Sequence, residues 1–118
     1  MFYQKLFSFF GFLGVSLGAF GAHGLKNKVS LESLEIWKTA TLYLLVHVII
    51  GLLSLFFAKS KKSAFCFALG SFLFAGSLYL LVILNMPILG IVTPFGGTAL
   101  LIGWIFLFFD FKKEIFQK

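Results

Sequence analysis

The sequence has very few charged residues, and this scarcity excludes an ordinary soluble domain. Charged side chains make up 12% of the 118 residues, whereas 60% of the residues are hydrophobic. The mean hydropathy is +1.04. A soluble domain is nearer half apolar and about a quarter charged. A water-soluble fold could not bury so much apolar surface, but a bilayer accepts apolar side chains all round a helix.

Arginine is absent, and all ten basic residues are lysines that stand in small groups between apolar runs. This pattern argues against nucleic acid as a partner. Lysines that flank apolar spans are instead typical of topology signals that face anionic headgroups. The single cysteine, Cys66, excludes an intramolecular disulfide. The lipid bilayer is therefore the expected partner.

Motifs for enzymatic chemistry are also lacking: there is no phosphate-binding loop, no G-x-S-x-G and no metalloprotease helix. The four acidic residues all lie at the ends of apolar runs: Glu32, Glu35, Asp110 and Glu114. Asp110 is expected to pair with Lys113. His23 and His47 could together bind a metal or a haem, but no cysteine pair or intramembrane acid supports this. We therefore expect neither a cofactor nor an enzyme.

Four apolar runs are long enough to cross a bilayer as helices, which takes about 20 residues at 1.5 Å each. The runs cover residues 6–22, 37–58, 63–84 and 95–111. Because they occupy most of the chain, residues 1–118 are predicted to form a single transmembrane domain. The expected fold is an all-α membrane protein with four transmembrane helices in a bundle.

The first run also resembles a signal peptide, because a lysine precedes it and small residues end it. We expect an uncleaved first span instead, since cleavage would remove a glycine-rich helix suited to packing. Gly24 is expected to end this helix in a left-handed conformation. Ser30 is expected to cap the second helix, whose first part would lie in the headgroup region, and Pro94 to stand near the start of the fourth.

The lysines predict the orientation of the spans. One side of the membrane would carry seven of them: Lys5, Lys59, Lys61, Lys62, Lys112, Lys113 and Lys118. The other side would carry Lys26, Lys28 and Lys38. Because lysine-rich loops stay in the cytoplasm, both termini are predicted to be cytoplasmic.

Small residues form stripes along the predicted helices, and in lipid such stripes let helix backbones approach closely. The glycines expected at helix contacts are Gly11, Gly14, Gly18, Gly21, Gly76, Gly96, Gly97 and Gly103. The four in the first run are spaced three, four and three residues apart and so share one face. We expect a tightly packed bundle; the alternative is that one stripe forms an oligomer interface.

A few polar residues at membrane depth are candidates for function, because burying them in lipid is costly. His47 is the main one, on a helix face that it shares with Tyr43, Gly51 and Ser54. It could handle protons or bind a metal, or it could be a structural histidine bonded to a neighbouring helix. The topology would gather a polar cluster at the outer end of the bundle: His23, Trp37, Tyr43, His47 and Thr93.

Four segments resemble the YwdK/YgdD-like family of small bacterial inner-membrane proteins. The segments are GAFGAHGLK at 18–26, LEIWKTA at 34–40 with Tyr43 and His47 after it, FAGSLYL at 74–80, and TPFGG at 93–97 followed by Gly103 and Trp104. One departure is Leu31, where the family often has proline. The resemblance implies four spans and a multi-pass location in the bacterial inner membrane, and it supplies no activity.

Two functional classes follow. The first is a non-enzymatic structural or accessory membrane component, acting as a homo-oligomer or with another membrane protein. The second is a small transporter or channel whose pathway uses the polar cluster around His47. The first is favoured because charged residues stand only at the ends of the spans and one histidine is little evidence for a relay.

Overall fold

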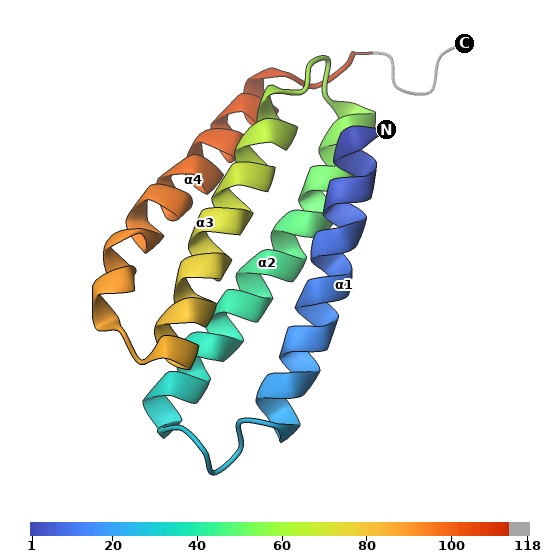
Figure 1. Ribbon diagram of the computed structural model, residues 1–118. Coiled ribbons are helices and arrows are strands. Elements are labelled where there is room, and N and C mark those ends of the chain that lie inside the picture. Colours follow the sequence, from blue (N-terminus) through green and yellow to red (C-terminus); the bar gives the residue numbers. More distant parts are fainter. Residues whose placement is uncertain (114–118) are drawn as a thin grey trace.

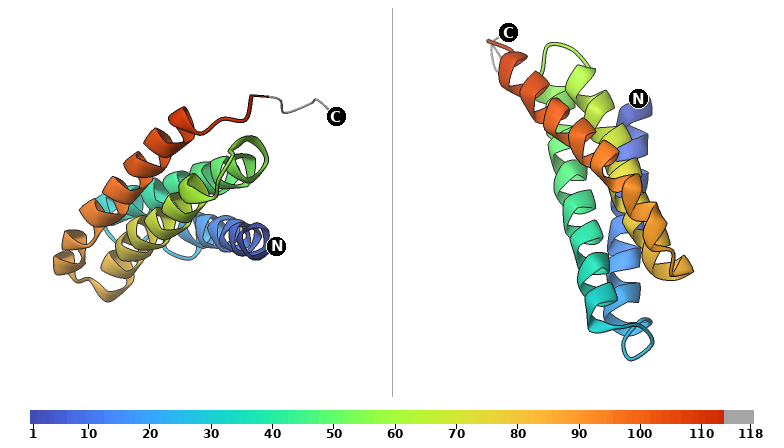
Figure 2. Two further views of the ribbon diagram at one scale, coloured as in Figure 1. Left: turned by 90° about the horizontal axis from the view of Figure 1, so that it is seen from above. Right: turned by 90° about the vertical axis from the view of Figure 1, so that its left-hand side faces the viewer.

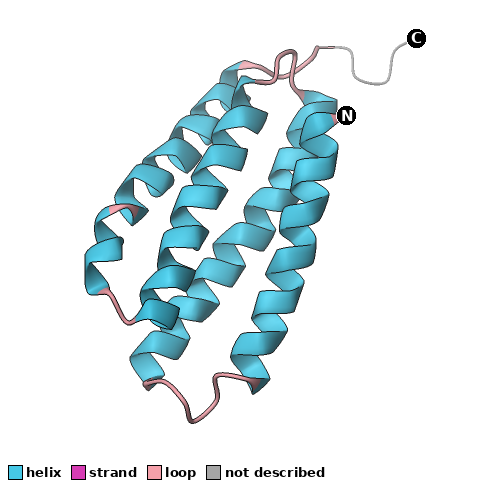
Figure 3. Cartoon of the chain, viewed as in Figure 1, coloured by secondary structure: helices cyan, strands magenta, loops and turns pink. Residues whose placement is uncertain are grey.

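The computed structural model describes residues 1–113, and these form a helical protein (Figures 1 and 3). Glu114 and Lys118, which the sequence places near the inner boundary, lie outside the described residues. The helices are α1 (Phe2–His23), α2 (Leu31–Phe57), α3 (Lys62–Leu84), the 3-10 helix η1 (Pro87–Ile91) and α4 (Thr93–Phe109).

Four helical segments are long and apolar enough to cross a bilayer: α1, α2, α3, and η1 together with α4. The α4 helix alone has 17 residues, which at 1.5 Å per residue is shorter than the roughly 30 Å hydrocarbon core. Adding η1 gives a segment of 23 residues, Pro87–Phe109. The prediction of an all-α protein with four potential membrane-spanning helices is confirmed.

Each helix packs antiparallel on its neighbour in sequence: α1 on α2, α2 on α3, and α3 on α4 (Figure 1). The view from above in Figure 2 places α1 and α4 at opposite edges of the bundle. The extents are 55 × 26 × 20 Å. The N-terminus, the α2–α3 loop and the end of α4 lie together at one end, because the chain runs the length of the bundle four times.

The glycine face of α1 is filled by α2. A Cβ added at Gly14 would lie 2.6 Å from a methyl carbon of Leu45, and one at Gly18 would lie 3.1 Å from Thr41. Gly11 faces Val48 in the same way, at 3.5 Å, and a Cβ at Gly21 would collide with the Trp37 ring. These four glycines therefore serve contacts within the chain.

The α3–α4 contact brings backbone against backbone. A Cβ at Gly96 would collide with the main chain of Phe74, and the Gly96 carbonyl oxygen lies 2.9 Å from where a Cβ on Gly70 would stand. Gly97 has looser surroundings, with the nearest Phe74 atom at 3.7 Å. Gly76 has nothing within 4 Å of an added Cβ, so the packing role expected of this glycine is absent here.

Helix ends show one expectation met and one corrected. The Ser30 hydroxyl accepts a bond from the Ser33 N–H at 3.0 Å, so the predicted cap of α2 is confirmed. The left-handed Gly24 is wrong, because this residue is right-handed helical with φ −74°. A Cβ there would lie 2.6 Å from the Phe20 ring, so a larger residue would require this ring to shift.

Candidate functional site

The polar residues singled out from the sequence are divided among several interhelical contacts. Trp37 joins α2 to α1 and α3. His47 joins α2 to α4. Thr93 joins α4 to α3. Each contact is a local hydrogen-bonded clasp between neighbouring helices.

The Trp37 clasp is buried, with 1% of the residue exposed. The indole Nε1 donates to the Leu17 carbonyl of α1 at 2.7 Å, and the ring packs edge-on against Tyr79 of α3 with centroids 4.5 Å apart. Thr41 gives its proton to the Trp37 carbonyl at 3.2 Å. The Tyr79 hydroxyl must then donate to the Thr41 oxygen, 2.7 Å away. Three helices are thus joined around one indole.

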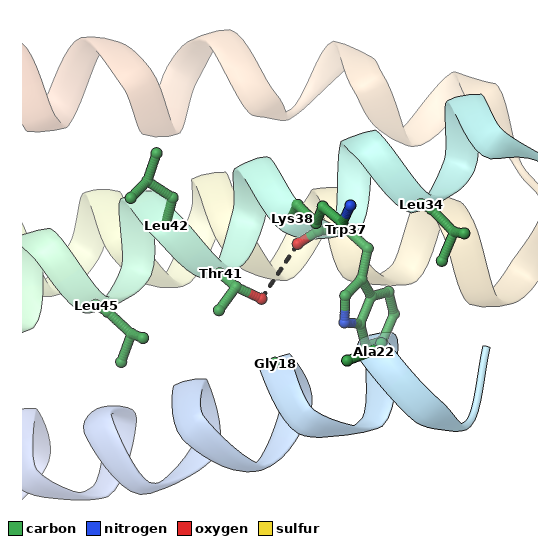
Figure 4. A pocket seen from close by; sticks show the side chains of 9 residues that line it. Gly18, Ala22, Leu34, Trp37, Lys38, Thr41, Leu42 and Leu45 are labelled. Atoms are coloured by element: carbon green, nitrogen blue, oxygen red, sulfur yellow. Dashed lines mark hydrogen bonds between the residues drawn. The ribbon is translucent and has the colours of Figure 1, made fainter. Parts of the chain in front are cut away.

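Beside this clasp lies an apolar groove of about 320 Å³ between α1 and α2 (Figure 4). Gly18 and Ala22 border it on α1, and Leu34 and Leu42 border it on α2. Its one charged lining residue is Lys38, which forms an exposed ion pair with Glu35 at 3.6 Å. The groove lining is mostly apolar and offers few groups for hydrogen bonding or catalysis.

The His47 clasp joins α2 to α4 through one ring nitrogen, and the other nitrogen bonds within α2. His47 is 6% exposed. Its Nδ1 lies 2.7 Å from the Tyr43 carbonyl of its own helix, and the Trp104 indole Nε1 donates to its Nε2 at 3.1 Å. The Trp104 ring is 5.9 Å away and nearly perpendicular.

These partners determine the protonation state of the His47 ring. An indole N–H can only donate, so Nε2 must accept. A backbone carbonyl can only accept, so Nδ1 must carry the proton. The imidazole is therefore neutral with its proton on Nδ1, and both nitrogens are occupied. In this state the ring links two helices and has no nitrogen free for a metal.

Phe67 of α3 packs against both rings of the His47 clasp. Its ring centroid lies 5.7 Å from that of His47 and 5.5 Å from that of Trp104. Gly103 leaves room for Phe67, since an added Cβ would lie 2.8 Å from the ring.

A groove of about 420 Å³ runs beside His47 between α2 and α4. Several of its lining residues are exposed, including Trp104 at 41%. The groove therefore opens on the side of the bundle, where lipid would lie.

The Thr93 clasp fastens the start of α4 to α3. Ser77 donates to the Phe74 carbonyl of its own helix at 3.0 Å. Its oxygen also lies 2.6 Å from the Thr93 hydroxyl. Because the one Ser77 proton is used, Thr93 must be the donor in this pair. The short connection through η1 thus ends in an interhelical bond.

Two of the singled-out residues contribute less than expected. The His23 side chain is exposed at the end of α1 and makes no side-chain hydrogen bond within residues 1–113. Tyr43 is 42% exposed, so the bundle only partly covers this member of the face that it shares with His47. It contributes its carbonyl to His47 and its ring to Phe74, 4.8 Å away. Residues 1–113 contain no group of three or more potential metal ligands.

The sequence analysis did not identify the hydrogen-bond partners of the candidate residues. Trp104, Tyr79 and Ser77 complete the three clasps. A buried or half-buried tryptophan or tyrosine usually finds a hydrogen-bond partner for its polar atom. That rule was the available signal for Trp104 and Tyr79, but it does not say which partner they find.

The opposite end of the bundle holds a further clasp, and it corrects the predicted Asp110–Lys113 pair. The Asp110 carboxylate accepts from the Ser60 hydroxyl at 2.5 Å and from the Ser60 N–H at 3.0 Å. The Ser60 hydroxyl bond is the main cause that holds the pKa of Asp110 below its usual range, and the charges of Lys59 and Lys62 add to it. The sequence-distant Ser60 is the better partner because its backbone N–H and hydroxyl both point at one oxygen.

Comparison with known proteins places the chain in a family. A family model described as "Protein of unknown function (DUF423)" matches residues 17–97. The UPF0382 membrane protein SAB0533 of Staphylococcus aureus is 42% identical over 114 residues, covering 88% of this chain and 93% of that protein. No solved structure shows significant similarity.

Two further relatives carry the same description. The UPF0382 membrane protein YwdK of Bacillus subtilis is 41% identical, with 80% of this chain and 83% of that protein covered. The UPF0382 membrane protein SH2409 of Staphylococcus haemolyticus is 38% identical, with 95% and 99% covered. With the four apolar helices described above, these matches identify the chain as a multi-pass membrane protein that belongs to the DUF423 family.

Proposed function

We propose that this protein is a non-enzymatic structural or accessory component of the bacterial cytoplasmic membrane, acting as a homo-oligomer or with another membrane protein. The observation that carries the proposal is the His47 clasp. The imidazole is the side chain within the spans best suited to proton transfer or metal binding. Both of its nitrogens are occupied, Nδ1 by the Tyr43 carbonyl of its own helix and Nε2 by the Trp104 indole of α4. The Trp37 and Thr93 clasps use their polar groups in the same way.

The lysines support an orientation with both termini in the cytoplasm. The end of the bundle that holds the N-terminus carries most of the described lysines: Lys5, Lys59, Lys61, Lys62, Lys112 and Lys113. The other end carries Lys26, Lys28 and Lys38. Cytoplasmic loops retain such an excess of lysine. Reporter fusions after Lys28 and Lys61 test the orientation, and an external signal after Lys61 would contradict it.

The structural role of His47 is tested by a double-mutant cycle with Trp104. The single variants are His47→Ala and Trp104→Phe, and unfolding in mixed detergent micelles gives their stabilities. If the clasp is structural, the two losses are non-additive, with a coupling of about 0.6 kcal/mol and at most about 1.7 kcal/mol, as for interhelical hydrogen bonds in membranes. Additive losses would mean that the bond contributes nothing.

A second measurement separates a clasp from a transport pathway. The purified protein is reconstituted in liposomes that contain a pH-sensitive dye, and proton entry is driven by a pH gradient. The proposal expects the wild type and His47→Gln to give the same rate as empty liposomes. A proton flux that the wild type supports and His47→Gln abolishes would overturn the proposal in favour of a small transporter or channel.

A further inference from the structure

Two basic segments that are far apart in sequence meet at one end of the bundle. The α2–α3 loop contains Lys59 and Lys61, and the segment after α4 contains Lys112 and Lys113. Two backbone hydrogen bonds of 2.8 Å join the segments, one from the Lys59 N–H to the Asp110 carbonyl and one from the Lys112 N–H to the Phe57 carbonyl. They form an isolated antiparallel bridge at Ala58 and Phe111.

The Asp110 side chain adds two further hydrogen bonds to this junction. Its carboxylate is held by the Ser60 hydroxyl and N–H. The four lysines of the joined segments, Lys59, Lys61, Lys112 and Lys113, are all exposed. Asp110 is the single acidic residue that the structure describes in the two joined segments. The junction therefore concentrates positive charge on one small surface.

Exposed phenylalanines lie in the second joined segment and on the adjoining ends of α3 and α4. Phe108, Phe109 and Phe111 are 74%, 75% and 50% exposed at the end of α4, and Phe65 is exposed on the first turns of α3. The Lys62 ammonium lies 5.7 Å from the centre of the Phe106 ring. A cationic surface bordered by exposed aromatic side chains matches an anionic headgroup bordered by acyl chains.

We propose that the joined segments 58–61 and 110–113 form one binding site for anionic phospholipid headgroups. The four lysines would contact the phosphodiester, and the adjacent phenylalanines would contact the upper acyl chains. The bridge and the Asp110–Ser60 bonds would hold the two lysine pairs at a fixed separation. This inference goes beyond the proposed function and is independent of it, since a lipid site can exist in either orientation and with or without transport.

The test measures binding of phosphatidylglycerol and phosphatidylcholine to the full chain in detergent micelles by native mass spectrometry. The pair variants are Lys59→Gln/Lys61→Gln and Lys112→Gln/Lys113→Gln. The matched control is Lys26→Gln/Lys28→Gln, which removes equal charge at the other end of the bundle. Since each lysine near an anionic surface contributes roughly fivefold, each pair variant at the site should weaken phosphatidylglycerol binding by roughly thirtyfold. The control should change it little.

Asp110→Ala separates a built site from simple charge attraction. This variant raises the net charge by one, so attraction by charge alone predicts tighter binding. The proposal predicts weaker binding, because the two lysine pairs lose the bonds that position them. Far-UV circular dichroism checks that the helices remain, and the pair variants keep the test decisive if Asp110→Ala does not fold.

Three results would overturn the proposal: an equal loss in the Lys26/Lys28 control, equal binding of phosphatidylcholine, or tighter binding by Asp110→Ala. Inorganic phosphate in millimolar excess is a further arm. It should fail to displace phosphatidylglycerol, because a free anion lacks the acyl chains that contact the phenylalanines. Displacement by phosphate alone would assign the surface to a soluble anion and contradict the lipid site.

Discussion

Replacing Gly96 with alanine should push α3 and α4 apart, whereas the same replacement at the adjacent Gly97 should be tolerated. A Cβ at Gly96 would collide with the backbone nitrogen of Phe74 and would lie 2.8 Å from its Cα. Backbone atoms inside a packed helix cannot move away as a flexible side chain can. At Gly97 the nearest atom is the Phe74 ring at 3.7 Å, which is ordinary van der Waals contact.

The magnitude follows from two opposing terms. Overpacking a close contact costs about 1–3 kcal/mol, and here the helices themselves must separate. Alanine instead of glycine in a helix gains up to about 1 kcal/mol. Both positions lie in the same turn of α4, so the helix-propensity gain is nearly equal and cancels in the comparison. The Gly96→Ala protein should therefore be less stable than the Gly97→Ala protein by about 1–3 kcal/mol.

The assay is reversible unfolding in mixed micelles with increasing sodium dodecyl sulfate, followed by far-UV circular dichroism. Gly76→Ala is a second control on α3, because no atom lies within 4 Å of its added Cβ. The reasoning is refuted if the Gly96 and Gly97 variants unfold at the same detergent fraction. It is also refuted if Gly76→Ala is as harmful as Gly96→Ala.

Three further predictions address the Trp37 clasp, the glycine face of α1 and the Asp110 clasp. Trp37→Phe should cost about 0.5–1.5 kcal/mol of stability through loss of the indole bond to α1, and an unchanged unfolding midpoint would argue against that bond. Gly14→Leu should impair folding in detergent, whereas Phe12→Leu, on the exposed face of α1, should not; equal yields of folded protein would contradict this. The lowered pKa of Asp110 means that its bonds to Ser60 stabilise the clasp at neutral pH, and this contribution is lost as the pH falls through the lowered pKa. Hydrogen-exchange protection of the Ser60 amide should hold down to about pH 4, and its loss between pH 7 and pH 5 would be inconsistent with that pKa.

The sequence alone determined the number of helices that are long and apolar enough to span a bilayer. Apolar runs of about 20 residues can satisfy their backbone groups in lipid only as helices, so composition and length were sufficient. Local signals also worked where one residue acts on its own helix, as for the Ser30 cap. The spacing of Gly11, Gly14, Gly18 and Gly21 indicated one packing face for the same reason, because a helix has a fixed period.

Local sequence signals were insufficient where the surroundings of a residue decide its backbone conformation or its contacts. Gly24 suited a left-handed helix end, yet it is right-handed and lies under the Phe20 ring. The sequence predicted that both Gly76 and Gly96 lie at helix contacts. Of these two, only Gly96 faces another backbone. The periodicity of residues along one helix does not determine which face of that helix the next helix will cover.

Only the tertiary structure decided the partners of the polar groups. The distance along the chain between His47 and Trp104, or between Ser60 and Asp110, contains no information about their contact. The pairs form because α2, α3 and α4 pack side by side in a particular rotation, and that rotation results from many small contacts summed over whole helices. The neutral state of His47 follows from the indole donor that this packing places against it.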